Sequence, residues 1–238
     1  MKPIYLFADS QLLFWRNETG LFLDTVRDLL EQPQPKAAYI GASNGDDPAF
    51  YTLFQGAMDG IGVSDCCMIN SQLTEAEASF LNEADLILLA GGDVQRGWDV
   101  FKKNGVREAV VKRYLEGAVL IGASAGSVQL GWFGWPEGEL TGNQLFDTFK
   151  LVPFVVDAHD EKNAWRNLRL SLQLCRGVVH GIGLPTGGGL IYHVNHSIES
   201  IRYPVVELFL QSGEIGQSLL LPPGIESSAD IVADNWLT

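Results

Sequence analysis

The stretch Ala118-Val-Leu-Ile-Gly-Ala-Ser-Ala-Gly-Ser-Val128 is an apolar run that breaks at Gly122-Ala-Ser124-Ala-Gly126 and continues into small residues. An apolar strand that enters a Gly-x-Ser-x-Gly turn and leaves as a helix is typical of a nucleophile elbow, which exposes the serine hydroxyl at the carboxyl end of the strand. The alternative is a glycine-rich turn that only packs tightly, because 26 glycines in 238 residues make chance matches common. The surrounding pattern therefore has to support the interpretation.

Short apolar runs alternate with helical patterns on both sides of this stretch. Strands are predicted at 4–8, 36–41, 66–69, 85–90, 118–123 and 154–158, and helices at 18–30, 49–58, 74–84, 95–115 and 164–174. This alternation is typical of a parallel sheet with helices on both faces. The sequence therefore predicts a three-layer α/β fold around a mostly parallel sheet.

The second half of the chain is less regular. Residues 132–148 are predicted as a loop or hairpin, and 178–184 as a further strand. Residues 190–194 and 205–210 are predicted to pair with each other as an antiparallel C-terminal edge. No linker or internal repeat divides the sequence, so we expect a single α/β domain over residues 1–238.

Composition limits the possible partners and location. The net charge of −13 argues against nucleic acid or an anionic membrane as a partner, because both require a basic face. No apolar run approaches the roughly 18 residues that cross a bilayer, and residues 1–9 are interpreted as a first strand and not as a signal peptide. The three cysteines lack metal-ligand spacing, so we expect no metal, and we expect no cofactor. A reducing cytoplasm is the expected location. The protein is expected to be a monomer or homodimer.

A nucleophilic serine needs a base, and histidine is suited to that task at neutral pH. His159 follows the strand at 154–158, and the carboxyl ends of parallel strands are where such folds bind ligands. His180 lies within an apolar run and is predicted to be a core or sheet-face residue. His193 and His196 lie near the C-terminal edge and lack the further ligands of a zinc site. His159 is therefore the candidate base.

Acyl transfer also needs two N–H donors for the oxyanion. The N–H of Ala125 follows the serine directly, and the N–H of Gly92 lies in the Gly91-Gly92 loop one strand earlier. That loop is equally compatible with an ordinary turn between a strand and a helix.

Several segments together resemble a known family. They are Gly91-Gly92-Asp93, the Gly122–Ser127 turn, His159, Arg166-x-x-Arg169-Leu170 and Gly181-Ile-Gly-Leu-Pro185. In order and spacing, over residues 36–192, they resemble the serine peptidases of the dipeptidase E (aspartyl dipeptidase) and cyanophycinase family. The resemblance implies a fold like that of class I glutamine amidotransferases.

The resemblance also implies roles for individual residues. Ser124 would be the nucleophile, His159 the base, and Gly92 and Ala125 the oxyanion donors. Arg166 would hold the acidic side chain of an aspartyl group, and Asp93 and Thr186 are further candidates for contact with the substrate, which would be a small peptide.

One position departs from the family pattern. After Gly-Leu-Pro185 the family carries a glutamate thought to orient the histidine, whereas this chain has Thr186. Threonine can accept a hydrogen bond but cannot stabilise an imidazolium by charge. The acids that could replace the glutamate are Glu137, Glu139, Asp157 and Asp160, with Glu139 first because an acid after the elbow has been proposed as catalytic in some family members.

The sequence therefore predicts a serine hydrolase that cuts a short peptide or isopeptide, an aspartyl one among the candidates, through an acyl-enzyme on Ser124. One alternative, motivated by Thr186, is a catalytically weak or inactive family member that binds a small ligand in the same pocket. The other alternative is an esterase of the α/β-hydrolase type. In that fold the catalytic histidine follows the acid and lies near the C-terminus, whereas the last histidine of this chain is His196.

Overall fold

A seven-stranded sheet in the order β13-β12-β1-β7-β6-β4-β5 forms the centre of the protein. The computed structural model describes residues 1–138, 140–141 and 144–224. The strands of this sheet are β1 (Ile4–Phe7), β4 (Lys36–Ile40), β5 (Asp65–Ile69), β6 (Leu86–Leu89), β7 (Val119–Ala123), β12 (Gly189–Tyr192) and β13 (Ile198–Ile201). The first five are parallel, and β12 and β13 add an antiparallel edge. The predicted fold class is confirmed.

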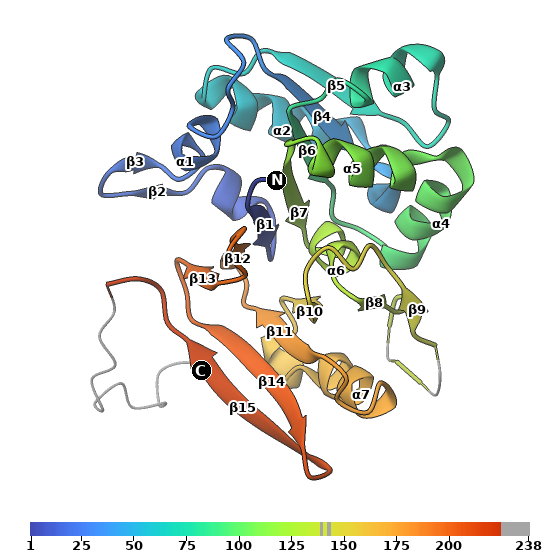
Figure 1. Ribbon diagram of the computed structural model, residues 1–238, viewed down its shortest axis with the longest axis vertical. Coiled ribbons are helices and arrows are strands. Elements are labelled where there is room, and N and C mark those ends of the chain that lie inside the picture. The colour runs from blue at the N-terminus through green and yellow to red at the C-terminus, as the bar shows by residue number, and fades with distance from the viewer. Residues whose placement is uncertain (139, 142–143, 225–238) are drawn as a thin grey trace.

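Helices cover both faces of this sheet (Figure 1). One face carries α1 (Asp24–Arg27) and α2 (Pro48–Gly60), and the other carries α3 (Glu75–Leu81), α4 (Val94–Asn104), α5 (Val106–Leu115) and α6 (Ala125–Leu130). Successive side chains of a strand point to opposite faces. Leu86 and Leu88 of β6 accordingly pack on the α2 side, and Ile87 and Leu89 pack on the α4 side, which explains why the strand is apolar throughout.

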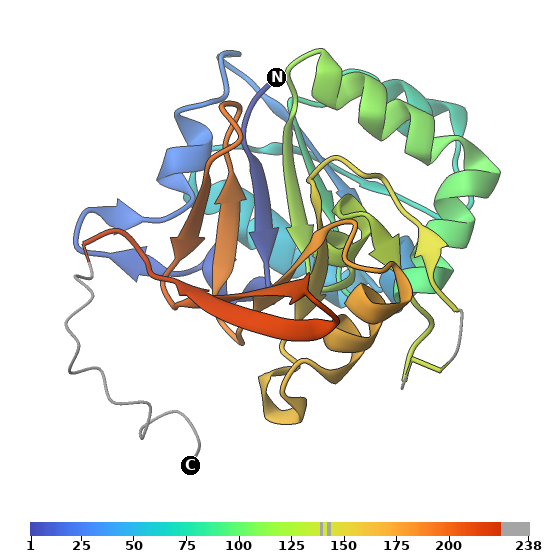
Figure 2. The same ribbon diagram turned by 60° about the horizontal axis from the view of Figure 1, so that its bottom comes forward.

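A second sheet has the order β10-β11-β14-β15. Its strands are β10 (Phe154–Ala158), β11 (His180–Leu184), β14 (Val205–Gln211) and β15 (Glu214–Leu220). One face packs into the core of the first sheet, and the other packs against α7 (Arg166–Leu174). Figure 2 shows the β14–β15 hairpin crossing below the strands of the first sheet.

This second sheet corrects one prediction. Residues 190–194 and 205–210 do not pair with each other, because β12 pairs with β1 and β13, whereas β14 pairs with β11 and β15. The two segments have similar apolar patterns but belong to different sheets.

Two predicted helices also differ. Within 18–30 only α1 is an α-helix. It is preceded by the short 3-10 helix η1 (Ser10–Leu13) and a hairpin of β2 (Arg16–Asn17) and β3 (Gly20–Leu21), in which the Asn17 side chain accepts hydrogen bonds from the N–H groups of Thr19 and Gly20. Such local side-chain bonds compete with helix formation. The helix predicted at 95–115 is divided into α4 and α5 at Gly105, whose φ is +80°.

Other local signals agree with the structure. The Asp47 side chain caps α2, and Thr74 and Glu77 form a capping box at the start of α3. The hairpin interpretation of 132–148 agrees with the pairing of β8 (Phe133–Gly134) and β9 (Phe146–Asp147). The 3-10 helices η2 (Ala42–Asn44) and η3 (Glu161–Asn163) complete the elements near the site.

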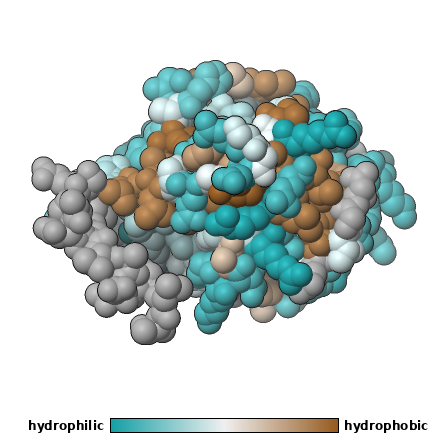
Figure 3. Space-filling view, turned by 90° about the horizontal axis from the view of Figure 1, so that it is seen from below, coloured by the Kyte–Doolittle hydropathy of each residue, from teal (hydrophilic) through white to brown (hydrophobic). Residues whose placement is uncertain are grey.

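The carboxyl ends of β1 and β7 point toward the lower face of the molecule (Figure 2). Seen from below, this face is largely hydrophilic, with hydrophobic residues between the hydrophilic ones (Figure 3). No helix in the described part of the chain is both long and apolar enough to span a membrane.

Candidate active site

Ser124 occupies a sharp turn between β7 and α6. Its backbone has φ 49° and ψ −110°, a rare conformation for a residue with a side chain, which persists only where the surroundings enforce it. The Ser124 N–H donates to the carbonyl of Phe7, and a Cβ at Gly126 would lie 2.1 Å from the carbonyl oxygen of Leu89. The turn is therefore wedged between β1 and β6, which fixes the direction of the serine side chain.

The structure brings together Ser124 and His159, which are 35 residues apart in sequence. Ser124 Oγ and His159 Nε2 are 2.9 Å apart, within hydrogen-bond reach. His159 follows β10 of the second sheet, and its backbone N–H donates to the carbonyl of Leu184. The two sheets therefore supply one residue each to this pair.

The other histidines have partners elsewhere. His180 begins β11 and pairs with Glu207 at 2.8 Å, and its side chain is exposed, so the prediction that it is a core residue is wrong while the sheet-face alternative holds. His193 lies 3.0 Å from Glu199, and His196 hydrogen-bonds to Tyr192. Within the described ranges, no cluster of three or more potential ligands is arranged to hold a metal ion.

The glycine loop after β6 lies directly against Ser124. A Cβ at Gly91 would lie 3.3 Å from Ser124 Cβ, and Gly92 has φ +128° with its Cα pressed against η2, where a Cβ would lie 2.2 Å from the Ser43 carbonyl oxygen. Only glycine fits at position 92. The N–H groups of Gly92 and Ala125 donate to no carbonyl among the residues that the structure describes. A role of these amides as oxyanion donors stays a prediction.

Asp93 has a structural contact. Its side chain accepts a hydrogen bond from the Arg96 N–H at 2.8 Å and so caps α4, while its own N–H donates to the Ser43 carbonyl. Contact between Asp93 and a substrate stays a prediction.

Thr186, which stands where the family glutamate is expected, holds another acid. Its Oγ1 donates to Glu161 Oε1 at 2.7 Å, and its backbone N–H donates to the same oxygen at 3.3 Å. Glu161 Oε2 is buried and has no hydrogen-bond partner among the described residues. Burial alone would raise the pKa of Glu161, but the hydrogen bonds from Thr186 and the attraction to His159 lower it below its usual value. The direction of this shift favours the ionised form of Glu161.

Glu161 was not among the acids considered from sequence. The one available signal was its position two residues after His159, in the acidic segment Asp160-Glu161. Its bond to Thr186 joins residues 25 positions apart and could not be read from the sequence pattern.

The predicted replacement acids are placed differently. Glu139 lies outside the described residues, and Glu137 is exposed. Asp160 accepts a hydrogen bond from the Asn163 side chain at 2.7 Å. Asp157 is only 8% exposed and, by strand alternation, faces α7 and not Ser124.

Asp157 should make the stability of the protein depend on pH. Burial, and then the negative charge of Asp160, raises its pKa from 3.8 to about 7. Folding therefore takes up a proton between pH 4 and 7, and stability falls as pH rises through this window. We expect the gain in stability of Asp157→Asn over wild type to be about 4 kcal/mol larger at pH 8 than at pH 4. Urea unfolding of both proteins at the two pH values measures this, and an unchanged difference would contradict it.

Arg166 begins α7 and is exposed. Its neighbour Arg169 donates to the Ala164 carbonyl and to the Gln217 side chain, and so serves the structure of the second sheet. Selection of an acidic substrate group by Arg166 stays a prediction.

A cavity of about 240 Å³ adjoins Ser124. Apolar side chains predominate around it, and the lining residues are Asp9, Ser10, Leu13, Tyr39, Asn44, Phe50, Leu53, Phe54, Leu88, Ala90, Gly91, Gly92, Ala123 and Ser124. These residues come from β4, β6 and β7, from the segments that follow β1, β4 and β6, and from α2. The carboxyl ends of parallel strands are where such sheets bind ligands.

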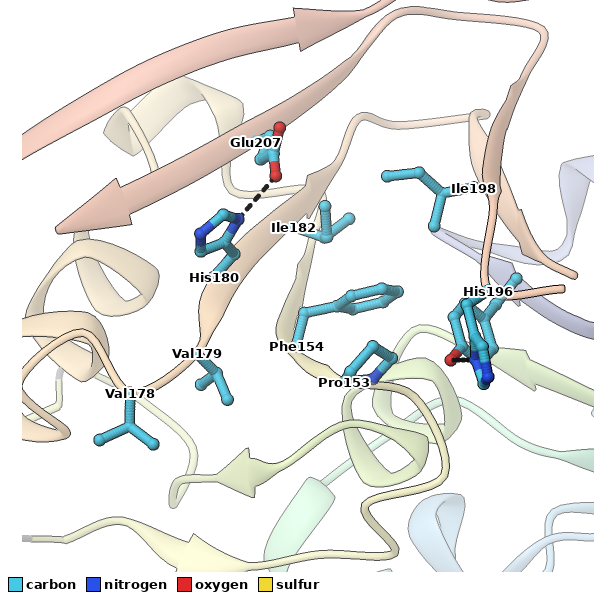
Figure 4. A pocket seen from close by; sticks show the side chains of 10 residues that line it. Pro153, Phe154, Val178, Val179, His180, Ile182, His196, Ile198 and Glu207 are labelled. Carbon is cyan, nitrogen blue, oxygen red and sulfur yellow. Dashed lines mark hydrogen bonds and ion pairs between the residues drawn. The ribbon is translucent and has the colours of Figure 1, made fainter.

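A second cavity, of about 330 Å³, lies at the opposite ends of β10 and β11. Figure 4 shows the His180–Glu207 pair on one side of it and His196 on the other. Phe154 and His180, which line it, are the first residues of their strands, whereas His159 follows the last residue of β10. This cavity is therefore separate from the Ser124–His159 pair.

Comparison with known proteins shows the family and the fold of the chain. The model of peptidase family S51 matches residues 13–194. A search of curated proteins finds no match. Among solved structures, a peptidase from an acI-B1 Actinobacterium is similar with a TM-score of 0.68 and 17% identity, covering 94% of this chain and 95% of that one. A putative peptidase E protein from Listeria monocytogenes EGD-e is similar with a TM-score of 0.55 and 16% identity, covering 92% and 99%. At these identities the structural likeness concerns the fold.

Proposed function

Because the chain belongs to peptidase family S51, we propose that it is a serine peptidase that hydrolyses a short peptide or isopeptide through an acyl-enzyme on Ser124. The observation that carries the proposal is the 2.9 Å contact between Ser124 Oγ and His159 Nε2, at a strained turn beside two available N–H donors. Strained backbone conformations cluster at functional sites.

The proposed reaction has two halves, acylation of Ser124 and hydrolysis of the acyl-enzyme, and the same groups act in both. Ser124 Oγ attacks the scissile carbonyl carbon while His159 Nε2 takes the hydroxyl proton. The oxyanion of the tetrahedral intermediate accepts hydrogen bonds from the N–H groups of Gly92 and Ala125. The carbon–nitrogen bond then breaks, His159 gives its proton to the leaving amine, and water hydrolyses the ester by the same route.

Glu161 is the proposed orienting acid. It is supported by the two hydrogen bonds from Thr186, which hold its carboxylate, and by the attraction to His159 that lowers the pKa of Glu161. A carboxylate near the imidazole stabilises the imidazolium that forms during the reaction. The threonine at the family glutamate position would then position the acid instead of supplying it.

The alternative of an inactive family member was based on Thr186 in place of the family glutamate. If Glu161 supplies the acid, that position no longer argues against catalysis. The family match sets aside the α/β-hydrolase esterase. The finer expectation, an acidic substrate group held by Arg166, remains open. Arg166 lies in the segment that follows His159. An acidic group held by Arg166 would therefore belong to the part of the substrate that lies next to His159.

The test of the proposed function is labelling with a fluorophosphonate, which reacts only with an activated serine. We expect the purified protein to take up one label on Ser124, located by peptide mass analysis, and His159→Ala to lose labelling. Absence of label on wild type, with the protein folded by circular dichroism, would contradict the proposal.

A further inference from the structure

The cavity beside Ser124 has no assigned occupant. We propose that it is the subsite for the side chain on the acyl side of the scissile bond and that it selects an apolar side chain, such as leucine or phenylalanine. This inference rests on the proposed function and names the substrate class of that site. It replaces, on the acyl side, the aspartyl group that the family resemblance implies.

The position of the cavity assigns it to the acyl side. His159 must give a proton to the leaving amine, so the leaving group lies next to His159 Nε2. Ser124 lines the cavity together with Gly91 and Gly92, whereas His159 does not. The part of the substrate that stays on the serine therefore faces this cavity.

The inner wall of the cavity is part of the hydrophobic core. Leu13, Tyr39, Phe54 and Leu88 are each less than 5% exposed and pack in the core on the α2 side of the sheet. The rings of Tyr39 and Phe54 contact each other, with centroids 5.4 Å apart. Because cores are closely packed, this wall is preformed and does not need to be ordered by a ligand.

The outer wall is formed by apolar side chains that are exposed to water. Phe50 and Leu53 of α2 are 48% and 44% exposed, and with Phe54 they stand at positions i, i+3 and i+4, on one helical face. Contiguous exposed apolar groups beside a reactive group are typical of ligand sites. A bound apolar side chain would cover both residues.

Charge around the cavity disfavours an acidic side chain. Asp9 is the charged member of its lining, and no basic side chain in the described part of the chain lines it. The Asp9 carboxylate already accepts hydrogen bonds from the N–H groups of Gln11 and Gly187. An aspartyl carboxylate placed here would lose water, gain no cation and lie near a like charge.

The volume of about 240 Å³ is also informative. Pockets that hold a whole drug-sized ligand measure about 300–1,000 Å³. The cavity is therefore sized for one residue of a short substrate, with the rest of the substrate outside it.

Binding to Ser124→Ala tests the inference without requiring turnover. The ligands are the p-nitroanilides of leucine, phenylalanine and aspartate, measured by calorimetry. We expect the leucyl and phenylalanyl compounds to bind at least about tenfold more tightly than the aspartyl compound, because apolar contacts of this size discriminate by that order. Equal affinities, tighter binding of the aspartyl compound, or undetectable binding of the apolar ones would overturn the inference.

A substitution at the outer wall should change this selectivity. Leu53→Arg, made in the Ser124→Ala background, adds a cation beside the cavity at a half-exposed position, so we expect the affinity ratio of aspartyl to leucyl compounds to rise at least about tenfold. Leu115→Arg is the matched control, because Leu115 is 61% exposed at the end of α5 and does not line the cavity. An unchanged ratio in Leu53→Arg, or an equal change in Leu115→Arg, would overturn the assignment.

Fluorophosphonate labelling of the wild-type protein separates the two proposals. Selective binding of the apolar compounds without labelling of Ser124 would keep the subsite and refute the peptidase. Labelling of Ser124 with preferred binding of the aspartyl compound would keep the peptidase and refute the subsite.

Discussion

Ser124→Ala is expected to lower kcat/KM for any peptide substrate by about 10⁴-fold to 10⁶-fold, because the hydroxyl forms the acyl-enzyme and nothing else at the site can replace it. The folded structure should be retained. Ser124 Oγ bonds only to His159 among the described residues, whereas the backbone bonds that hold the turn remain in the variant. Steady-state kinetics and urea unfolding of the same preparation measure both quantities.

Ser127→Ala is the matched comparison for Ser124→Ala. Ser127 Oγ is buried and donates to the carbonyls of Phe7 and Gly122, so its loss should lower the free energy of unfolding by about 1–2 kcal/mol. We expect this variant still to take up the fluorophosphonate on Ser124. Full turnover by Ser124→Ala would remove the nucleophile assignment, and equal loss of labelling in both variants would show that the substitutions act through the shape of the turn.

Glu161→Gln is expected to lower kcat by about 10²-fold to 10⁴-fold, because a neutral amide cannot stabilise the imidazolium at His159. Glutamine keeps an oxygen that can accept the hydrogen bond from Thr186, so folding should be little affected. Steady-state kinetics and urea unfolding of the same preparation measure both effects. A purely structural role for Glu161 would lower the free energy of unfolding and leave kcat unchanged.

Three companion variants make the Glu161 prediction specific. Thr186→Val removes the hydroxyl that holds Glu161 and should lower kcat by a smaller factor, about tenfold. Asp160→Asn removes the adjacent acid, which bonds to Asn163, and should leave kcat within about twofold of wild type. If Glu139→Gln instead abolishes turnover while Glu161→Gln is fully active, the orienting acid is Glu139.

Short-range patterns in the sequence predicted most of the central sheet. The run at 118–123 and its glycine-serine turn correspond to β7 and the start of α6, and the Thr74–Glu77 pattern corresponds to the capping box of α3. These features depend on residues within one strand or one helical turn, so a linear sequence contains all the necessary information. The same reasoning predicted a helix at 18–30 that is largely absent. There the Asn17 side chain bonds to nearby backbone N–H groups and competes with helix formation.

The pairing of Ser124 with His159 was also within reach of the sequence. Strands that alternate with helices place their carboxyl ends at one face of the molecule, so residues that follow two different strands can be expected to meet there. The structure adds that the two strands belong to different sheets, which a pattern of apolar residues does not distinguish.

The sequence by itself determined the α/β fold, the serine turn and the candidate base, because strand period, turn glycines and chain order encode them locally. Only the tertiary structure decided that Thr186 holds Glu161 and what lies beside Ser124. The Glu161–Thr186 bond spans 25 residues, and the apolar cavity combines residues of β4, β6, β7 and α2 with residues that follow β1. Contacts of this kind depend on how separate elements pack against one another, and the sequence of one segment does not specify which other segment it will contact.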